Sequence, residues 1–144
     1  MTNRSKSTLF LIEQLIVIAV FAICAVACIS ILTAAYFNAS DSNATSQAIL
    51  RAESAAEVFK ATGGDHNVAS SILGGTLGLK SGYPAALVYY DSGWQISNEY
   101  NASYVLSLAY YPIAGFNELT IADLIVERIT GEELVAFQIA VRSN

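Results

Sequence analysis

The stretch Leu9–Val20, LFLIEQLIVIAV, opens a long apolar segment in which Glu13 and Gln14 are the first polar side chains. From Leu15 to Phe37 the only clearly polar residues are one serine and one threonine. At 1.5 Å per residue, such a run forms a helix long enough to span the roughly 30 Å hydrocarbon core of a bilayer. The sequence therefore predicts one transmembrane helix over residues 9–37.

The charges around this segment predict its direction across the membrane. Arg4 and Lys6 precede it, and no acid occurs before Glu13. Because basic residues are retained on the cytoplasmic side, the N-terminus is expected in the cytoplasm and the rest of the chain outside it. We therefore expect a single-pass plasma membrane protein, with a short basic cytoplasmic leader over residues 1–8.

The remainder, residues 38–144, is expected to form one small extracytoplasmic head. The whole chain is 54% hydrophobic and only 13% charged, which is far from the composition of disordered proteins. After Phe37 the sequence holds eleven acids and five bases. This negative balance argues against nucleic acid as a partner.

The head is expected to begin with a second helical stretch. Residues 38–46 are polar, small and weak in helix propensity, so the helix could melt or kink there. The pattern of Ala48, Ala52 and Phe59 then predicts an amphipathic helix over residues 47–62. Two glycines follow and would end it.

Beyond this helix the sequence predicts a loop and then strands. Residues 65–84, rich in Gly and Ser, are interpreted as a connecting loop with one helical turn. A hairpin is expected from two strands around the turn at 91–93, and later strands from alternating apolar side chains. The expected strands cover residues 86–90, 94–97, 104–111, 119–127 and 135–142, with a turn at Thr130-Gly131.

Together these elements predict an α+β fold with an antiparallel meander. A sheet with one apolar face must cover it, and the outer half of the N-terminal helix is the only long element available. The aromatic residues of the head are expected to pack in the core and at its rim, with a binding face as the alternative. They are Tyr89, Tyr90, Trp94, Tyr100, Tyr104, Tyr110 and Tyr111.

Glu13 is the residue that points beyond anchoring. An unpaired charge at membrane depth costs on the order of 2.5 kcal/mol or more, so it is expected to have a partner. The alternative is that Glu13 lies in the headgroup region near the start of the helix, where the helix dipole favours an acid.

The segment from Leu9 to Val20 resembles the N-terminal signature of type IV pilins and type II secretion pseudopilins. These have a short basic leader, an apolar first residue and a glutamate at the fifth mature position. The resemblance implies a pilin-like fold and a structural role as a minor pilin or pseudopilin in a filament. It also implies cleavage by a prepilin peptidase between Thr8 and Leu9, and methylation of the new amine.

In that family the glutamate is thought to attract the terminal amine of a neighbouring subunit. Carried over, Glu13 would pair with the Leu9 amine of another pilin-like subunit, with membrane lipid around both. Pairing offsets the desolvation cost of two buried charges and would fix the register between apolar helices.

This chain departs from the family at three positions. Thr8 stands where a very small residue is usual before the cut, Gln14 follows the glutamate, and Ser30 replaces a frequent proline. If the leader stays attached, Leu9 has no free amine, and Arg4 or Lys6 becomes the candidate cation.

Two other classes of membrane protein were weighed. The first is a membrane-tethered binding domain that does not polymerise. The second is a lipoprotein with Cys28 as the lipidated residue, which the continuing apolar run after it argues against. Cys24 and Cys28 are interpreted as small apolar filling.

No residue pattern indicates an enzyme, a cofactor or a metal site. His66 is the only histidine and is expected to be a solvated loop residue. The run Gly74–Gly78 lacks the Lys-Ser/Thr of a phosphate-binding loop and is interpreted as a flexible turn.

Overall fold

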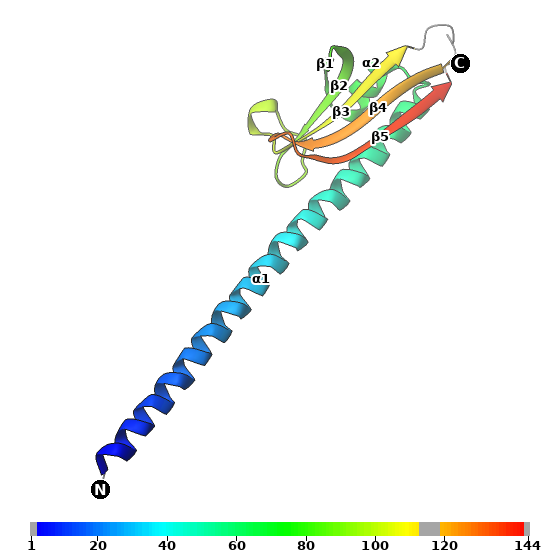
Figure 1. The fold of residues 1–144 in the computed structure, drawn as a ribbon. Helices are drawn as coiled ribbons and strands as arrows, with labels where there is room; N and C mark the ends of the chain where they lie inside the picture. Colours follow the sequence, from blue (N-terminus) through cyan, green and yellow to red (C-terminus); the bar gives the residue numbers. More distant parts are fainter. Residues whose placement is uncertain (1–2, 113–118, 143–144) are drawn as a thin grey trace. The chain divides into compact units, whose positions relative to one another are not determined.

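The computed structural model describes residues 3–112 and 119–142, with side chains for residues 7–111 and 119–142. The chain divides into two compact units, Met1–Ser42 and Asn43–Asn144. The second is called the head unit below. Figure 1 shows the elements: helices α1 (Asn3–Ala61) and α2 (His66–Leu73), a 3₁₀ turn (Glu99–Asn101), and strands β1 (Thr76–Lys80), β2 (Tyr83–Tyr90), β3 (Tyr104–Pro112), β4 (Leu119–Arg128) and β5 (Glu133–Arg142).

The strands form one antiparallel sheet in the order β1-β2-β3-β4-β5, in which every neighbour along the chain is a neighbour in space. The end of α1 lies against this sheet, which confirms the predicted α+β fold (Figure 1). The expected strands near 104–111, 119–127 and 135–142 are confirmed as β3, β4 and β5, and β5 begins two residues earlier than expected.

Helix α1 has helical backbone at every residue from Asn3 to Ala61, so the melting that the sequence allowed at residues 38–46 does not occur. Polar residues of weak propensity remain helical where a helix face packs in a core. Ala44, only 4% exposed, belongs to that core.

Small residues let α1 approach the sheet closely. Its core-facing side is a line of alanines ending at Phe59, and all of these side chains are nearly or fully buried. Opposite them lie alternate residues of the central strands, since paired residues share one face of the sheet. The line on α1 is Ala44, Ala48, Ala52, Ala55 and Phe59, and the sheet side is Val88, Leu106, Leu108, Leu124 and Val126.

The expected loop at 65–84 is wrong apart from its helical turn, because the segment contains α2, β1 and the start of β2. Asp65 Oδ1 accepts from the backbone N–H groups of Asn67 (2.9 Å) and Val68 (3.2 Å), which caps the N-terminus of α2. Gly74, with φ of 69°, ends α2 in the left-handed conformation. Residues 74–78 are therefore a helix cap and the start of a strand, and the interpretation as a flexible turn is also wrong.

The second strand of the expected hairpin, residues 94–97, is wrong as well. A single bridge joins Tyr90 and Ile96, and no strand forms. Asp91 Oδ1 accepts from the N–H groups of Gly93 (2.9 Å) and Gln95 (3.0 Å), which closes a compact turn. Trp94 takes φ of 60° and turns into the core, where it is 6% exposed.

Candidate functional site

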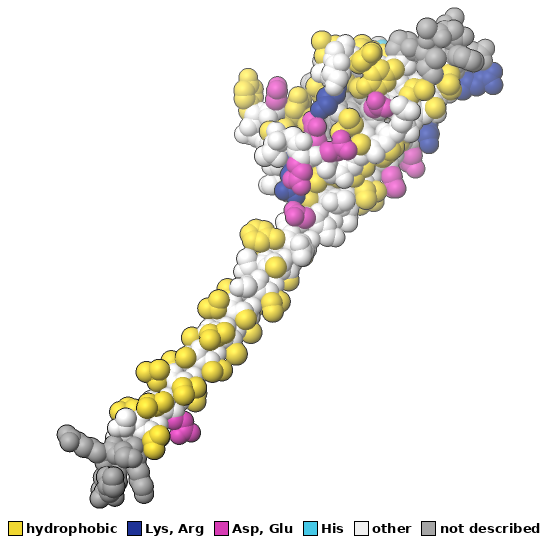
Figure 2. Space-filling model, viewed as in Figure 1, with side chains coloured by type: hydrophobic (Ala, Val, Ile, Leu, Met, Phe, Trp, Pro, Cys, Tyr) yellow, Lys and Arg dark blue, Asp and Glu magenta, His cyan; other side chains and the backbone are white. Residues whose placement is uncertain are grey.

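The apolar surface of α1 is the first feature of the candidate site. Every large apolar side chain from Leu9 to Phe37 is between 52% and 74% exposed. Figure 2 shows these side chains along the helix. They occur on all sides, because runs such as residues 9–12 and 15–18 cover every direction around a helix. A helix that is apolar all round is typical of a membrane span or a large core.

The hydroxyls of the two polar side chains inside the run donate hydrogen bonds to backbone carbonyls of the same helix. Ser30 Oγ donates to the carbonyl of Val26 at 2.9 Å, and Thr33 Oγ1 donates to the carbonyl of Ile29 at 2.8 Å. Such bonds to the preceding turn leave no donor in need of water. The segment can therefore enter hydrocarbon without an unpaired hydroxyl donor.

Among residues 3–112 and 119–142, Ser7–Ala61 is the one helical stretch long and apolar enough to cross a membrane. The observation matches the expected transmembrane helix in length and composition. The direction in which the helix would cross stays a prediction.

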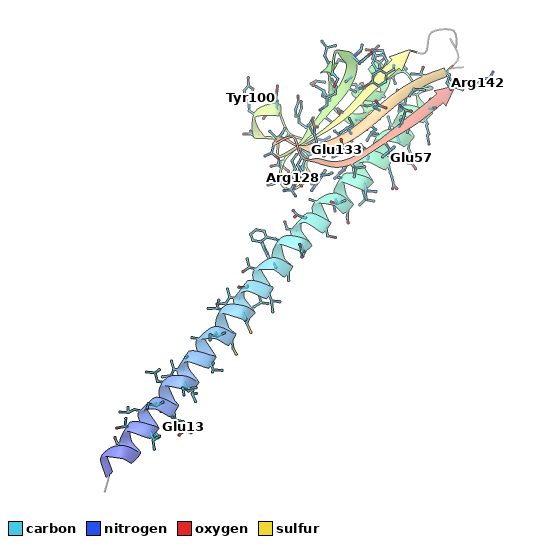
Figure 3. All side chains as sticks on the ribbon, viewed as in Figure 1. Glu13, Glu57, Tyr100, Arg128, Glu133 and Arg142 are labelled. Carbon is cyan, nitrogen blue, oxygen red and sulfur yellow. The ribbon has the colours of Figure 1, made fainter. Side chains whose placement is uncertain are left out.

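Glu13 is an exposed carboxylate on this apolar helix (Figure 3). The next charged residue along the chain is Asp41. In the described part of the chain no cation pairs with Glu13. The side chains of Arg4 and Lys6, the alternative partners, lie outside the described residues.

Thr8 and Leu9, the predicted processing site, lie in α1 one helical turn before Glu13. Leu9 is 63% exposed. With the leader attached, the Leu9 nitrogen is a peptide amide, so a cationic amine at this position requires cleavage before it.

Cys24 and Cys28 are free and exposed. Cys24 follows Glu13 by 11 residues (24 − 13), which is about three turns at 3.6 residues per turn, so the two side chains lie on the same face of α1. Cys28 is one turn further along that face. From the sequence both thiols were interpreted as small apolar filling. Because they lie on the same face of α1 as Glu13, crosslinking through them would show which helix packs against that face.

His66, expected in a solvated loop, instead begins α2 and stacks on Tyr110. The ring centroids are 4.1 Å apart, and Tyr110 Oη lies 3.1 Å from His66 Nε2. Within the described residues, no group of three or more His, Cys, Asp or Glu side chains is placed to hold a metal.

An aromatic cluster packs against Arg51 of α1 and joins the helix to the turn at 91–97. No pattern in the sequence indicated the contact with Arg51. Trp94 stacks on Tyr104 with 4.2 Å between ring centroids, and Tyr90 lies 5.8 Å from Trp94. The guanidinium carbon of Arg51 lies 5.5 Å from the Tyr90 ring centroid. These contacts fit the expected packing role for Tyr90, Trp94 and Tyr104, whereas Tyr100 is 96% exposed.

Comparisons with known proteins do not add to this description: no protein-family model, curated protein or solved structure matches the chain. The architecture, a long apolar N-terminal helix whose last turns pack on a small antiparallel sheet, is consistent with a pilin-like protein.

Proposed function

We propose that this chain is a structural subunit, a minor pilin or pseudopilin, of a type IV pilus-like or type II secretion-like filament. Its apolar helix would pack beside the helices of other pilin-like subunits in and above the membrane. Glu13 would set the register between them. The single observation that carries the proposal is that Glu13 is the one charged residue, and an exposed one, in the segment from Leu9 to Phe37, whose large apolar side chains are exposed on all sides of α1.

The head unit supports this proposal because its hydrophobic core is complete without residues 9–37. One face of its sheet is covered by the alanine line of α1, and the central side chains of both are fully buried. The core of the head unit therefore does not require the side chains from Leu9 to Phe37. These remain available for lipid or for other helices.

The carboxylate has a specific use between such helices. Apolar helices slide past one another at little cost, since lipid tails are as apolar as their side chains. A buried carboxylate without a cation is costly, whereas a carboxylate paired with an ammonium offsets much of that cost. Pairing between subunits would therefore select one axial offset from many.

The value of this offset follows from the two residues. If Glu13 of one subunit pairs with the Leu9 amine of a parallel neighbour, the helices are displaced by four positions, or about 6 Å along the axis. If the leader is retained and the cation is Lys6 or Arg4, the displacement becomes seven (13 − 6) or nine (13 − 4) positions. The proposal favours the first value, which requires cleavage after Thr8 by a prepilin peptidase.

The test substitutes the carboxylate and keeps its size. In cells, Glu13→Gln should leave membrane insertion intact and abolish co-purification of this chain with its pilin-like neighbours. Gln14→Ala is the matched control, because it removes the adjacent polar side chain and keeps the charge. Loss of co-purification in Glu13→Gln alone supports the proposal.

The competing function is a membrane-tethered binding domain that does not polymerise and uses the helix only as an anchor. It predicts that wild type and Glu13→Gln behave alike, with neither drawn into a larger assembly. That result would replace the filament proposal with the tether.

A further inference from the structure

Four Asn-x-Ser/Thr triplets occur in the chain. With any residue but proline in the middle, this triplet is the acceptor motif for N-linked glycosylation of surface segments in exported proteins. Because the motif is short, the surroundings of each triplet decide which is a credible acceptor. The triplets are Asn3-Arg4-Ser5, Asn38-Ala39-Ser40, Asn43-Ala44-Thr45 and Asn101-Ala102-Ser103.

Two triplets are poorly placed because they lie inside α1. Residues two positions apart on a helix do not face each other, so the hydroxyls of Ser40 and Thr45 point away from the amides of Asn38 and Asn43. Ala44, in the middle of one triplet, is 4% exposed against the sheet. An enzyme that must read the amide and the hydroxyl together would have to unwind the helix.

The triplet at Asn3 is excluded by topology. It lies in the basic leader, on the side of the membrane expected to be cytoplasmic, and cleavage before Leu9 would remove it.

The triplet at Asn101 lies outside the regular helices: Asn101 is exposed, and Ala102 and Ser103 are half-buried. Asn101 ends the 3₁₀ turn, and Ala102 continues in an extended conformation with φ of −73° and ψ of 142°. Tyr100, the preceding residue, is 96% exposed, so this turn is open to solvent. Figure 3 shows where Tyr100 lies in the fold.

The backbone around Asn101 is held, and its side chain is not. Its N–H donates to Asn98 Oδ1 at 3.0 Å. The Ser103 N–H donates to the Tyr90 carbonyl at 2.8 Å, and the Ser103 carbonyl accepts from Ile129 N–H at 3.0 Å. In the described part of the chain, the Asn101 side-chain amide makes no hydrogen bond. The fold thus presents an unused amide on a fixed, solvent-facing turn.

We propose that Asn101 carries an N-linked oligosaccharide on the outer surface of the head unit. The donor would be a lipid-linked oligosaccharide activated by phosphate or diphosphate, and a membrane transferase would catalyse the step. Asn101 Nδ2 forms a bond to the anomeric carbon of the first sugar. The bond from that carbon to the phosphate oxygen breaks, the lipid phosphate leaves with the electron pair, and the amide nitrogen loses one proton.

This proposal rests on the N-in, C-out topology of the proposed function. The experiment therefore measures topology and modification separately. The full chain is purified from the membranes of the cells that produce it, and its peptides are mapped by mass spectrometry. In parallel, protease added to intact cells or spheroplasts reports whether the head unit is outside.

Three variants isolate the triplet. Ser103→Ala retains Asn101 and both backbone bonds of residue 103 but destroys the acceptor motif, whereas Ser103→Thr preserves the motif. Asn38→Gln is the control for the helical triplets. We expect an added mass fitting a series of sugar residues on the Asn101 peptide, complete loss of it in Ser103→Ala, and no loss in the other two.

The failures are distinguishable. If the head unit is digested from outside and the Asn101 peptide is unmodified, the glycosylation proposal is overturned while the membrane topology stands. Sugar on Asn38 or Asn43 alone also overturns it. If the head unit is protected from protease outside the cell, the topology is wrong and both proposals are overturned.

Discussion

Arg51 Nη2 on α1 donates a hydrogen bond of 3.1 Å to the backbone carbonyl of Trp94. The same guanidinium lies over the Tyr90 ring. Trp94 holds a positive φ, which is unusual for a bulky residue and persists only where surrounding contacts impose it. Arg51 therefore joins the helix to the turn that follows β2.

The first prediction concerns this contact. Arg51→Ala removes a charge-assisted hydrogen bond and a cation–π contact, and should lower the free energy of unfolding of the head unit by about 1.5–3 kcal/mol. Lys60→Ala, at an exposed position on the same helix, should change it by less than about 0.5 kcal/mol. The probe is the fluorescence of Trp94, the only tryptophan, in the detergent-solubilised full chain. Equal effects of the two variants would contradict the assigned role.

Gly75 provides a second prediction, based on space alone. A Cβ at this position would lie 2.7 Å from the Leu87 carbonyl oxygen and 2.9 Å from Val88 Cγ2. Gly75→Ala should therefore force β1 away from β2 and cost about 1–3 kcal/mol in chemical denaturation. Gly93→Ala is the control, since its Cβ would come no nearer than 3.4 Å to Asp91 Oδ1. An unchanged midpoint for Gly75→Ala would show that β1 is not packed as described.

Tyr90 predicts how stability depends on alkaline pH. Burial raises the pKa of its phenol above the ordinary 10.0, and the nearby Arg51 charge opposes this with a smaller effect. The folded chain thus holds the proton more tightly than the unfolded chain. Its contribution to stability is complete below pH 10 and is lost as pH rises through the folded-state pKa.

Tyr90→Phe should therefore reduce the slope with which the free energy of unfolding falls above pH 10. Burial also raises the pKa of Tyr89 and Tyr110, so the decline should not vanish. Urea unfolding at several pH values gives the slope. Tyr100→Phe is the control for loss of an exposed phenol, and an equal slope in the two variants would refute the prediction.

Processing gives the fourth prediction. Mass spectrometry of the N-terminal peptide from cells should find a chain beginning at Leu9, with or without a methyl group on its amine. Thr8→Gly, which supplies the small residue usual before the cut, should give at least as much cleaved product. A chain that begins at Met1 in both would exclude the processed subunit and leave Arg4 or Lys6 as the cation.

The sequence predicted the elements with strong periodicity. Strands β3 to β5 were visible because their apolar side chains alternate, and the helix packing was visible in the spacing of Ala48, Ala52 and Phe59. Strand β1 was missed because it is short, contains Gly78 and follows two glycines that are typical of loops. Its pairing with β2 depends on a close backbone approach at Gly75 that no local pattern reveals.

The same limits apply to the site. Glu13 could be recognised from the sequence because a single charge inside an apolar run stands out without knowledge of the fold. The link between Arg51 and Trp94 joins residues far apart in sequence, and no spacing rule predicts it. The sequence could not separate the Asn101 triplet from those at Asn38 and Asn43, because only the fold shows that the latter two lie in a helix.

Crosslinking between Cys24 and Cys28 measures the axial offset between neighbouring helices most directly. A displacement of four positions that brings Glu13 of one subunit level with Leu9 of its neighbour also brings Cys28 level with Cys24, since both pairs differ by four. Displacements of seven or nine bring neither thiol level with another. Cells producing Cys24→Ser and Cys28→Ser variants together are treated with a short bifunctional thiol reagent.

We expect crosslinked dimers when the two single-cysteine variants are mixed, far fewer with either variant alone, and their loss when Glu13→Gln is added to both. Dimers that persist in Glu13→Gln, or that form equally with one variant alone, would contradict the proposed register and the role of Glu13.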